Sequence, residues 1–274
     1  MPVMRRLAQL IVIHACAFLY VSSTYAYGSL GHEIVGEIAW QNLCEPAQVE
    51  VELLLGDESL GEASRWPDWI RGEREWAHTR TWHYINVADE GSLELVLNSN
   101  DSNVITAIEW SRAQLADDRL SAEKQAQALR FLAHFVADVH QPLHVGRAED
   151  RGGNRIAVRV DGRKTNLHKL WDAQWLLRTD RKAANYRRDG QVEMISQFAR
   201  FTPESGEVLD WARESQALRA EVYALPAAAD DGVIVVDEPY LAAALDISRI
   251  RLAEAGVRLA GELNTIYCDA SDTP

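Results

Sequence analysis

The sequence predicts a mainly helical protein that folds as one compact multi-helix domain with a small β-hairpin. Apolar residues recur at helical spacing through most of the chain. One short segment instead alternates apolar and polar residues on either side of an Asp161-Gly162 turn. The 274 residues, of which 47% are hydrophobic, suffice to bury one large core. No stretch rich in Gly, Ser or Pro divides the chain, and we expect one domain over residues 27–274.

Residues 1–26 have the features of a secretory signal peptide. Two arginines give a basic start, an almost wholly apolar run follows from Leu7 to Val21, and small residues lead up to Ala26. Cleavage before Tyr27 would give a secreted or periplasmic protein with no membrane attachment. The alternatives are a retained membrane anchor and a lipoprotein cleavage site at Cys16. The apolar run is, however, shorter than the about 20 residues that span a bilayer.

Seven segments of the remaining chain have helical periodicity. They cover residues 34–39, 49–55, 104–115, 121–139, a short stretch near 167, 208–224 and 239–266. Asn103 is a good N-cap for the third segment, and Pro239 suits the first turn of the last one. Residues 226–238 are expected to form a loop. Residues 56–102 and 144–166 are expected to be largely irregular apart from the hairpin.

Two His/Asp pairs at helical spacing carry the first chemical signal. The helix over 121–139 has an apolar stripe made of Leu129, Leu132, Val136 and Val139. His134 and Asp138 lie about 40° apart on its opposite side, and His168 and Asp172 repeat the i, i+4 spacing. Zinc accepts imidazole nitrogen and carboxylate oxygen at about 2.0 to 2.2 Å. One such pair is weak evidence because most are surface hydrogen bonds, but two pairs favour a metal site.

The charge of the chain argues against a general polyanion-binding surface. Loss of residues 1–26 removes two arginines and no acid, which changes the formal net charge from -13 to -15. Non-specific affinity for nucleic acid comes mostly from Lys and Arg that neutralise phosphates. A phosphate-binding site must therefore carry its positive charge locally, as bound metal does. The zincin, nucleophile-elbow, Walker and dinucleotide-binding motifs are all absent from the sequence.

Seven motifs follow one another in a characteristic order. They are Tyr27-Gly-Ser-Leu-Gly-His32, Trp66-Pro-Asp68, Trp82-His83-Tyr84-Ile85, Asn103-Val-Ile-Thr-Ala-Ile108, Ala128-Leu-Arg-Phe-Leu-Ala-His134-Phe-Val-Ala-Asp138-Val-His-Gln-Pro-Leu-His144-Val-Gly146, Gly152-Gly-Asn154 and Asn166-Leu-His168-Lys-Leu-Trp-Asp172. With this set the chain resembles the zinc-dependent type I nucleases. These are fungal, plant and bacterial enzymes that cut single-stranded nucleic acid and have a helical fold like that of zinc phospholipase C. The resemblance covers essentially the whole chain after residue 26.

The resemblance implies a cluster of three zinc ions. One ion would be held by Asp68, His83, His134 and Asp138. A second would be held by His144, His168 and Asp172. The third would share Asp138 and would also use His32 and the backbone amine and carbonyl oxygen of Tyr27. Members of the family commonly begin with Trp at this position, and since the implied contacts come from backbone atoms, we expect Tyr27 to preserve them.

The resemblance also implies an endonuclease that cuts single-stranded DNA and RNA to 5′-phosphate products and acts on 3′-nucleotides as a side activity. The ions that share Asp138 would activate water, and the ion at His144 would stabilise the leaving 3′ oxygen. The implied catalytic residues are Asp68, Arg71, Asp138 and Asn154. Arg71 and Asn154 would contact phosphate oxygens, and Tyr84 would stack on an unpaired base. An ordinary solvated arginine and a core tyrosine are the alternatives for Arg71 and Tyr84.

Several alternatives stay open at this point. A zinc phospholipase C would have a similar cluster, and a non-catalytic zinc protein would more often have a closed, cysteine-rich site. We expect a monomer without an obligate protein partner.

Cys44 and Cys268 either pair in an oxidising compartment or remain as buried thiols. Five tryptophans are expected to pack as walls around the ligand-bearing segments: Trp66, Trp69, Trp82, Trp171 and Trp175.

Overall fold

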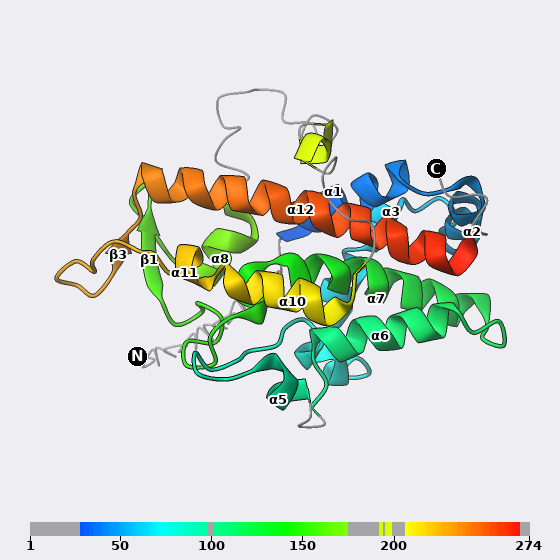
Figure 1. The fold of residues 1–274 in the computed structure, drawn as a ribbon, viewed down its shortest axis with the longest axis horizontal. Helices are drawn as coiled ribbons and strands as arrows, with labels where there is room; N and C mark the ends of the chain where they lie inside the picture. The colour runs from blue at the N-terminus through cyan, green and yellow to red at the C-terminus, as the bar shows by residue number, and fades with distance from the viewer. Residues whose placement is uncertain (1–27, 98–100, 175–191, 194, 199–205, 269–274) are drawn as a thin grey trace, which may run out of the picture.

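The structure is a computed structural model that describes residues 28–97, 101–174, 192–193, 195–198 and 206–268. Helices account for most of these residues, and one sheet of three short strands lies at one end of the molecule (Figure 1). The predicted mainly helical class is confirmed. The predicted signal peptide, Tyr27 and Trp175 lie outside the described residues.

The helices differ widely in length. In chain order they are α1 (Gly28–Gln41), α2 (Glu45–Leu55), α3 (Leu60–Ala63), α4 (Trp66–Ile70), the 3-10 helix η1 (Ala77–Thr81), α5 (Leu93–Leu97), α6 (Val104–Leu115), α7 (Ala122–His140), the 3-10 helix η2 (Pro142–Val145), α8 (Leu167–Lys169), the π-helical turn η3 (Leu170–Gln174), α10 (Val208–Ala217), α11 (Arg219–Val222) and α12 (Glu238–Tyr267). The strands are β1 (Ala157–Val160), β2 (Arg163–Asn166) and β3 (Ile234–Val235).

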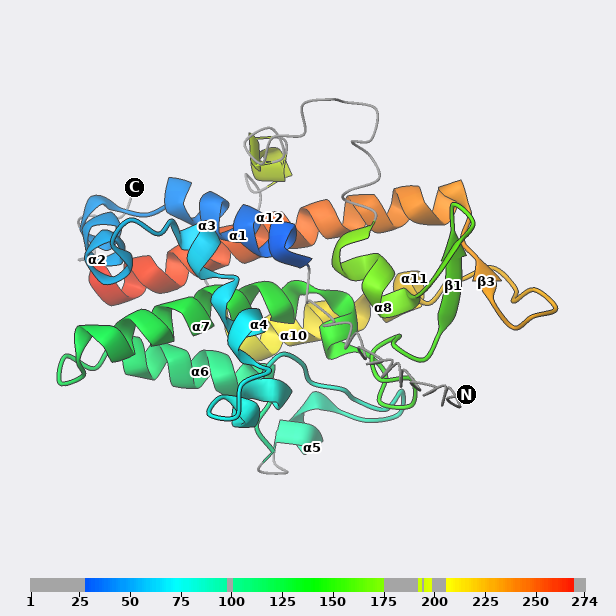
Figure 2. The same cartoon turned by 180° about the vertical axis from the view of Figure 1, so that it is seen from behind.

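Helix α7 is the central element of the fold. It packs against α1, α6, α10 and α12, and Figures 1 and 2 show it lying between the long α12 and α6. Every residue from Phe131 to His140 is buried. The side of α7 that carries His134 and Asp138 is therefore as buried as the apolar stripe. Helix α1 covers this side, since the ring of His32 stacks on the ring of His134 with 3.9 Å between centroids.

A buried polar network fixes the C-terminal end of α7. The Nδ1 atom of His140 lies 2.7 Å from the Val136 carbonyl oxygen, and Nη1 of Arg258 donates to Nε2 of the same ring at 2.9 Å. Nε of Arg251 donates to the His140 carbonyl oxygen at 3.1 Å, and Glu214 accepts from both guanidinium groups. Burial and the two arginines hold the pKa of His140 well below its usual range. The neutral ring therefore connects α7 to α10 and α12.

Local sequence signals set several element boundaries as predicted. The Asn103 side chain caps α6 by accepting hydrogen bonds from the backbone N–H groups of Ile105 and Thr106. Strands β1 and β2 pair as an antiparallel hairpin. Its turn residues Asp161 and Gly162 have φ values of 50° and 74°, which suit a tight hairpin connection. The helix predicted over 239–266 is α12.

Three boundaries differ from the prediction. The helix expected over 208–224 divides at Leu218 into α10 and α11. The loop expected over 226–238 contains β3, which pairs parallel with β1 through only two residues and so has no alternating pattern to detect. Residues 56–102 contain the short helices α3, α4, η1 and α5, each of which has at most five residues. Such lengths are too short for a visible helical period.

The longest helix, α12, is tied to the start of the fold by a disulfide. Cys268 at its C-terminal end bonds to Cys44, the N-cap residue of α2. Asn264 supports the junction, since its Oδ1 accepts from the Cys44 N–H at 3.0 Å and its Nδ2 donates to the Asn42 carbonyl oxygen at 3.0 Å. The two cysteines are therefore paired. Within the described ranges, α12 and the other helices lack the apolar length that a membrane-crossing segment requires.

Replacing both cysteines by alanine is expected to lower the free energy of unfolding by about 2–4 kcal/mol. The bridge joins residues separated by 224 positions and so restricts the unfolded chain strongly. Denaturant unfolding of the wild type and of C44A/C268A, followed by circular dichroism, measures the difference. Superimposable unfolding curves would contradict this role of the bridge.

Candidate metal centre and substrate pocket

Buried histidines and aspartates form three adjacent groups inside the fold. Within each group the nearest ligand atoms all lie within 4.8 Å of one another. The groups are His32, His134 and Asp138; Asp68, His83 and His134; and His144, His168 and Asp172. The structure thus brings together every side chain that was predicted as a ligand, and all of them are buried. Tyr27, the remaining predicted ligand, lies outside the described residues.

Short helices and turns deliver most of these side chains to α7. Pro142 cannot continue α7, and it begins η2, which carries His144 back toward the helix end. Strand β2 ends at Asn166, whose Oδ1 accepts from the Lys169 N–H at 2.8 Å and so caps α8. This cap places His168 in the first turn of α8, one helical turn before Asp172.

Backbone carbonyl groups hold three of the imidazoles in place. The Nδ1 atoms of His134, His144 and His168 lie 2.7, 2.6 and 2.8 Å from carbonyl oxygens. The acceptors are Ser64, His83 and Gly152, in that order. A proton on Nδ1 satisfies each of these contacts and leaves Nε2 with its lone pair for a metal. Histidine ligands in proteins are commonly oriented in this way.

The backbone carbonyl group of Gly152 orients His168, and two features of this position require glycine. Its φ is 59°, in the left-handed region that favours glycine. A Cβ at this position would overlap the Leu143 carbonyl oxygen, and a Cβ at Gly146 would overlap the Cα of Gly152. The two glycines thus let the 152–154 turn lie directly against η2.

Asp138 is the common partner of four imidazoles. Its Oδ2 lies 3.0 Å from Nδ1 of His83 and 3.2 Å from Nε2 of His134. Its Oδ1 lies 3.5 Å from Nε2 of His32 and 3.4 Å from Nδ1 of His144. Burial opposes ionisation of this carboxyl group, but the imidazoles of His134 and His144 outweigh burial and hold the pKa of Asp138 well below its usual range.

The imidazoles titrate differently according to their neighbours. Burial lowers the pKa of His32, His83 and His168, which favours the neutral form that binds metal. Burial opposes protonation of His144 as well, yet Asp138 and Asp172 raise the pKa of its imidazole to about 9. The metal-free protein therefore holds a positive charge on His144 at neutral pH.

The donor set fits a divalent cation such as zinc. Several buried ligand atoms make no hydrogen bond within the described part of the chain: Nδ1 and Nε2 of His32, Nε2 of His83, Oδ1 of Asp138, Nε2 of His144 and Oδ2 of Asp172. Buried polar atoms without partners are costly, and a cation would satisfy those that face the groups. Nitrogen and carboxylate oxygen donors without thiolate suit catalytic zinc, which keeps positions open for water and substrate.

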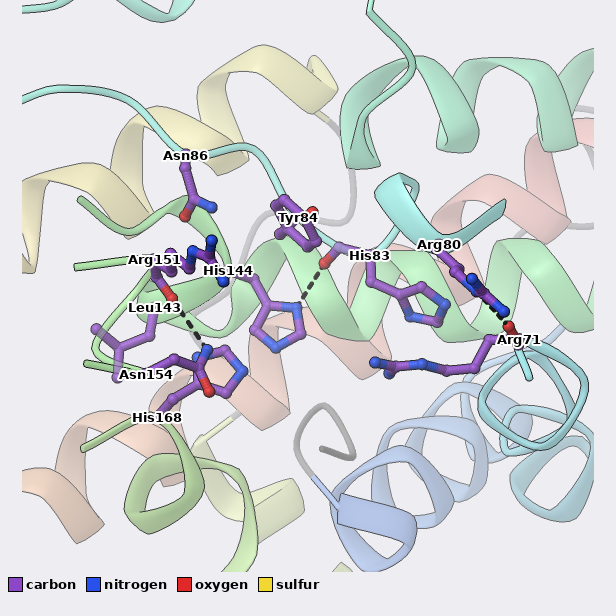
Figure 3. A pocket seen from close by; sticks show the side chains of 10 residues that line it. All are labelled: Arg71, Arg80, His83, Tyr84, Asn86, Leu143, His144, Arg151, Asn154 and His168. Atoms are coloured by element: carbon purple, nitrogen blue, oxygen red, sulfur yellow. Dashed lines mark hydrogen bonds between the residues drawn. The ribbon is translucent and has the colours of Figure 1, made fainter. Parts of the chain in front are cut away.

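A cavity of about 630 Å³ opens above these groups (Figure 3). This volume lies in the usual range of ligand pockets, about 300–1,000 Å³. The cavity is lined by Arg71, Arg80, His83, Tyr84, Asn86, Leu143, His144, Arg151, Asn154 and His168. Three predicted ligands thus face the same space as the side chains predicted to contact substrate.

The residues predicted to contact substrate all line the cavity. Nη1 of Arg71 donates to Oδ1 of Asp68 at 3.0 Å, which ties the guanidinium to a predicted metal ligand. The Tyr84 side chain is 41% exposed, and this exposure contradicts the alternative of a core tyrosine. Nδ2 of Asn154 donates to the Arg151 carbonyl oxygen at 2.9 Å, which fixes the orientation of its amide.

Sequence reasoning missed three polar residues of the cavity: Arg80, Asn86 and Arg151. Arg151 immediately precedes the Gly152-Gly-Asn154 turn, and its proximity to that motif was an available signal. Arg80 lies in the five-residue helix η1 and Asn86 lies in a loop, and neither segment has a visible helical or strand period. Asn86 directly follows the Trp82-His83-Tyr84-Ile85 motif, which was a similar signal, whereas nothing in the sequence distinguishes Arg80 from a solvated side chain.

The predicted tryptophan walls are partly correct. Trp66 and Trp82 pack on Phe131 with ring centroids 5.2 and 5.6 Å apart, and Trp171 is fully buried. The prediction was wrong for Trp69, which is 50% exposed. Successive residues of a helix point about 100° apart, so the inward direction of Asp68 in α4 leaves Trp69 near the surface.

Comparison with known proteins identifies the family. The family described as S1/P1 Nuclease matches residues 27–268. The chain belongs to the S1/P1 nuclease family. It is 32% identical over 268 residues to "Endonuclease 2" of Arabidopsis thaliana, an overlap of 89% of this chain and 91% of the relative. It is 27% identical over 265 residues to "Nuclease P1" of Penicillium citrinum, an overlap of 88% of this chain and 98% of the relative.

A third relative matches over a shorter stretch. "Nuclease S1" of Aspergillus oryzae is 29% identical over 172 residues, which cover 60% of this chain and 59% of that protein. The resemblance seen in the sequence motifs is thus confirmed, and this member of the S1/P1 nuclease family is a hydrolase of phosphodiester bonds in nucleic acid. The family assignment favours neither a phospholipase C nor a non-catalytic zinc protein.

Metal binding is expected to release at least one proton per chain at pH 7. His144, with its pKa raised to about 9, must lose its proton before it can bind metal. The apparent metal affinity should therefore rise with pH up to about 9. Titration calorimetry in buffers of different ionisation enthalpy counts the protons, and His144→Ala should release fewer. Binding heats that are independent of the buffer would contradict the assignment.

The same pKa shift predicts how the metal-free protein responds to pH. Since the pKa of His144 is raised on folding, its ion pairs with Asp138 and Asp172 contribute fully below pH 6.5 and are lost as the pH rises through about 9. We expect the metal-free protein to lose part of its stability over this interval, and metal to restore it. Thermal unfolding with and without a chelator at each pH measures both effects.

Proposed function

We propose that this chain is an exported, monomeric, zinc-dependent endonuclease that cuts single-stranded DNA and RNA to 5′-phosphate products. Hydrolysis of 3′-nucleotides would be a side activity of the same site. The observation that carries the proposal is the set of three His/Asp groups joined through Asp138 and His134, directly beneath a cavity lined by arginines. The family assignment supplies the reaction class.

The three groups are proposed to hold three zinc ions. Asp68, His83, His134 and Asp138 would bind the first, and His144, His168 and Asp172 the second. His32 and Asp138 would bind the third together with the amine and carbonyl oxygen of Tyr27. Bound zinc would supply a water of lowered pKa and a Lewis acid at the leaving oxygen. Such a site needs no protein nucleophile.

The side chains around the cavity have separate proposed roles. Asp138 stays ionised because imidazoles surround it, and its two oxygens, which contact His32 and His83, would bind the third and the first ion. Arg71, held by its hydrogen bond to Asp68, would bind a nonbridging oxygen of the scissile phosphate. Asn154, whose amide is fixed by the Arg151 carbonyl group, would donate to the same phosphate. The positive charge of Arg71 would stabilise the negative charge that develops on the phosphate oxygens in the transition state.

Three observations support export and the terminal ligand. The family match begins at residue 27, the residue expected after signal cleavage. The Cys44–Cys268 disulfide suits an oxidising compartment. His32 lies one turn into α1, which begins at Gly28, and its ring faces Asp138 at 3.5 Å. A free amine directly before α1 would therefore lie close in sequence to the group that it is proposed to complete.

Metal analysis combined with N-terminal sequencing tests the ligand sets. The processed protein is expected to begin at Tyr27 and to contain about three zinc ions. A version with one additional residue before Tyr27 should lose one of these ions and most of its activity, because its amine is displaced. Full activity and full zinc content in the extended protein would refute the terminal ligand. Full activity in the presence of a strong chelator would refute the metal mechanism.

Tyr84 is proposed to stack on an unpaired base, which explains a preference for single strands. Replacement of Tyr84 by Ala should lower kcat/KM on single-stranded DNA, and the ratio of the two values should correspond to a loss of about 1–3 kcal/mol of transition-state stabilisation. Tyr84→Phe is the matched control and should retain most of the activity, because stacking needs only the ring. Assays on single-stranded DNA, duplex DNA, RNA and phosphatidylcholine define the substrate. Equal rates for Tyr84→Ala and the wild type would rule out stacking.

A further inference from the structure

The cavity concentrates positive charge in an acidic protein. The chain has 41 acidic and 28 basic residues, yet three arginines and no carboxylate are among the side chains that line the cavity: Arg71, Arg80 and Arg151. Arg71 is tied to Asp68 and is assigned to the scissile phosphate. The other two arginines have no role in the proposed chemistry at the scissile phosphate.

Arg80 and Arg151 lie on opposite sides of the metal centre. Figure 3 shows Arg80 next to Arg71, on the side of His83 that faces away from His144. The same view shows Arg151 at the other end, beyond His144 and on the side of His168. A strand that crosses the cavity over the metal centre would meet one arginine before the cleavage position and the other after it.

Arg80 is exposed but partly anchored. Its Nε donates to the Arg71 carbonyl oxygen at 2.9 Å, which directs the guanidinium along the cavity wall. No ion pair joins Arg80 to a carboxylate of the described residues within 4.0 Å, so its terminal nitrogens are available to a ligand. A guanidinium with this freedom suits a phosphate oxygen.

Arg151 has an uncommon backbone conformation for its residue type. Its φ is 58°, in the region that glycine adopts most easily, and the neighbouring Gly152 and Gly153 also have positive φ. Its carbonyl oxygen accepts from Asn154, while its exposed side chain forms no ion pair with a described carboxylate. The turn that fixes Asn154 therefore also projects a guanidinium over the cavity.

We propose that Arg80 and Arg151 bind the two phosphates that flank the scissile one, each on its own side. The inference rests on the proposed endonuclease function and extends it to the substrate class. Because a dinucleoside monophosphate carries only the scissile phosphate, it lacks both contacts. The enzyme is thus built to prefer the interior of a single strand of at least four nucleotides. Local arginines provide the attraction that the acidic surface lacks.

A double-mutant-type cycle, in which a charge is removed from the enzyme, from the substrate or from both, tests this inference. The zinc-loaded enzyme cleaves a four-nucleotide single strand at its central phosphodiester. Three further strands carry a neutral methylphosphonate at the 5′ flanking linkage, at the 3′ flanking linkage, or at both. For the wild type, each neutral linkage should lower kcat/KM for central cleavage about three- to fivefold. Each of Arg80→Gln and Arg151→Gln should lose its response to one flanking linkage and keep its response to the other.

Two sets of variants separate a phosphate contact from a general effect. Arg80→Lys and Arg151→Lys keep the charge and should restore most of the response to the neutral linkages. Arg163→Gln removes an exposed arginine at the hairpin turn, outside the cavity, and should respond to both linkages as the wild type does. Each glutamine variant should also reduce the salt slope of log kcat/KM by about 0.7.

The possible failures are distinguishable. If both glutamine variants lose activity equally on all four strands, the arginines do not contact the flanking phosphates and the inference is wrong. The same holds if the wild type cleaves all four strands at one rate. If the zinc-loaded wild type cleaves none of the strands, the proposed endonuclease function itself fails.

Discussion

The fold depends on one buried carboxylate, Asp138. A carboxylate removed from water on every side is costly unless positive or hydrogen-bonding groups surround it. Here the nitrogens of four imidazoles lie within 3.0 to 3.5 Å of its oxygens. These imidazoles come from α1, the segment after η1, α7 itself and η2. These segments must pack against α7 so that their imidazoles reach the Asp138 carboxylate. The packing of the fold and the geometry of the site therefore depend on the same contacts.

Buried histidines on and next to α7 serve two different purposes, which their hydrogen bonds reveal. Both ring nitrogens of His140 have partners within the protein, namely the Val136 carbonyl oxygen and Arg258. By contrast, His32, beside α7, and His144, just after it, keep ring nitrogens without a hydrogen-bond partner in the described chain. His140 therefore fastens helices together, whereas His32 and His144 retain a lone pair for a metal.

The sequence predicted the elements whose signals are local and long. The i, i+4 pairs on α7 and at His168 and Asp172 could be found from spacing alone, because one helix turn brings the two side chains together. His32, His83 and Asp68 could be placed only through family resemblance, since their proximity arises from tertiary packing. The exposed Arg80 and Arg151 carry no periodic signal, and the two residues of β3 are too few to alternate. Tertiary neighbours, rather than propensity, decide these positions.

The bridge between Cys44 and Cys268 has a consequence for where the enzyme can work. It joins the beginning of α2 to the end of the last helix, so it can close only after almost the whole chain has been made. Thiols in a reducing cytosol stay open. A nuclease whose final covalent bond forms only in an oxidising environment is least stable beside the RNA and DNA of the cell that produces it. The bridge therefore makes the stability of this enzyme depend on the redox state of its surroundings.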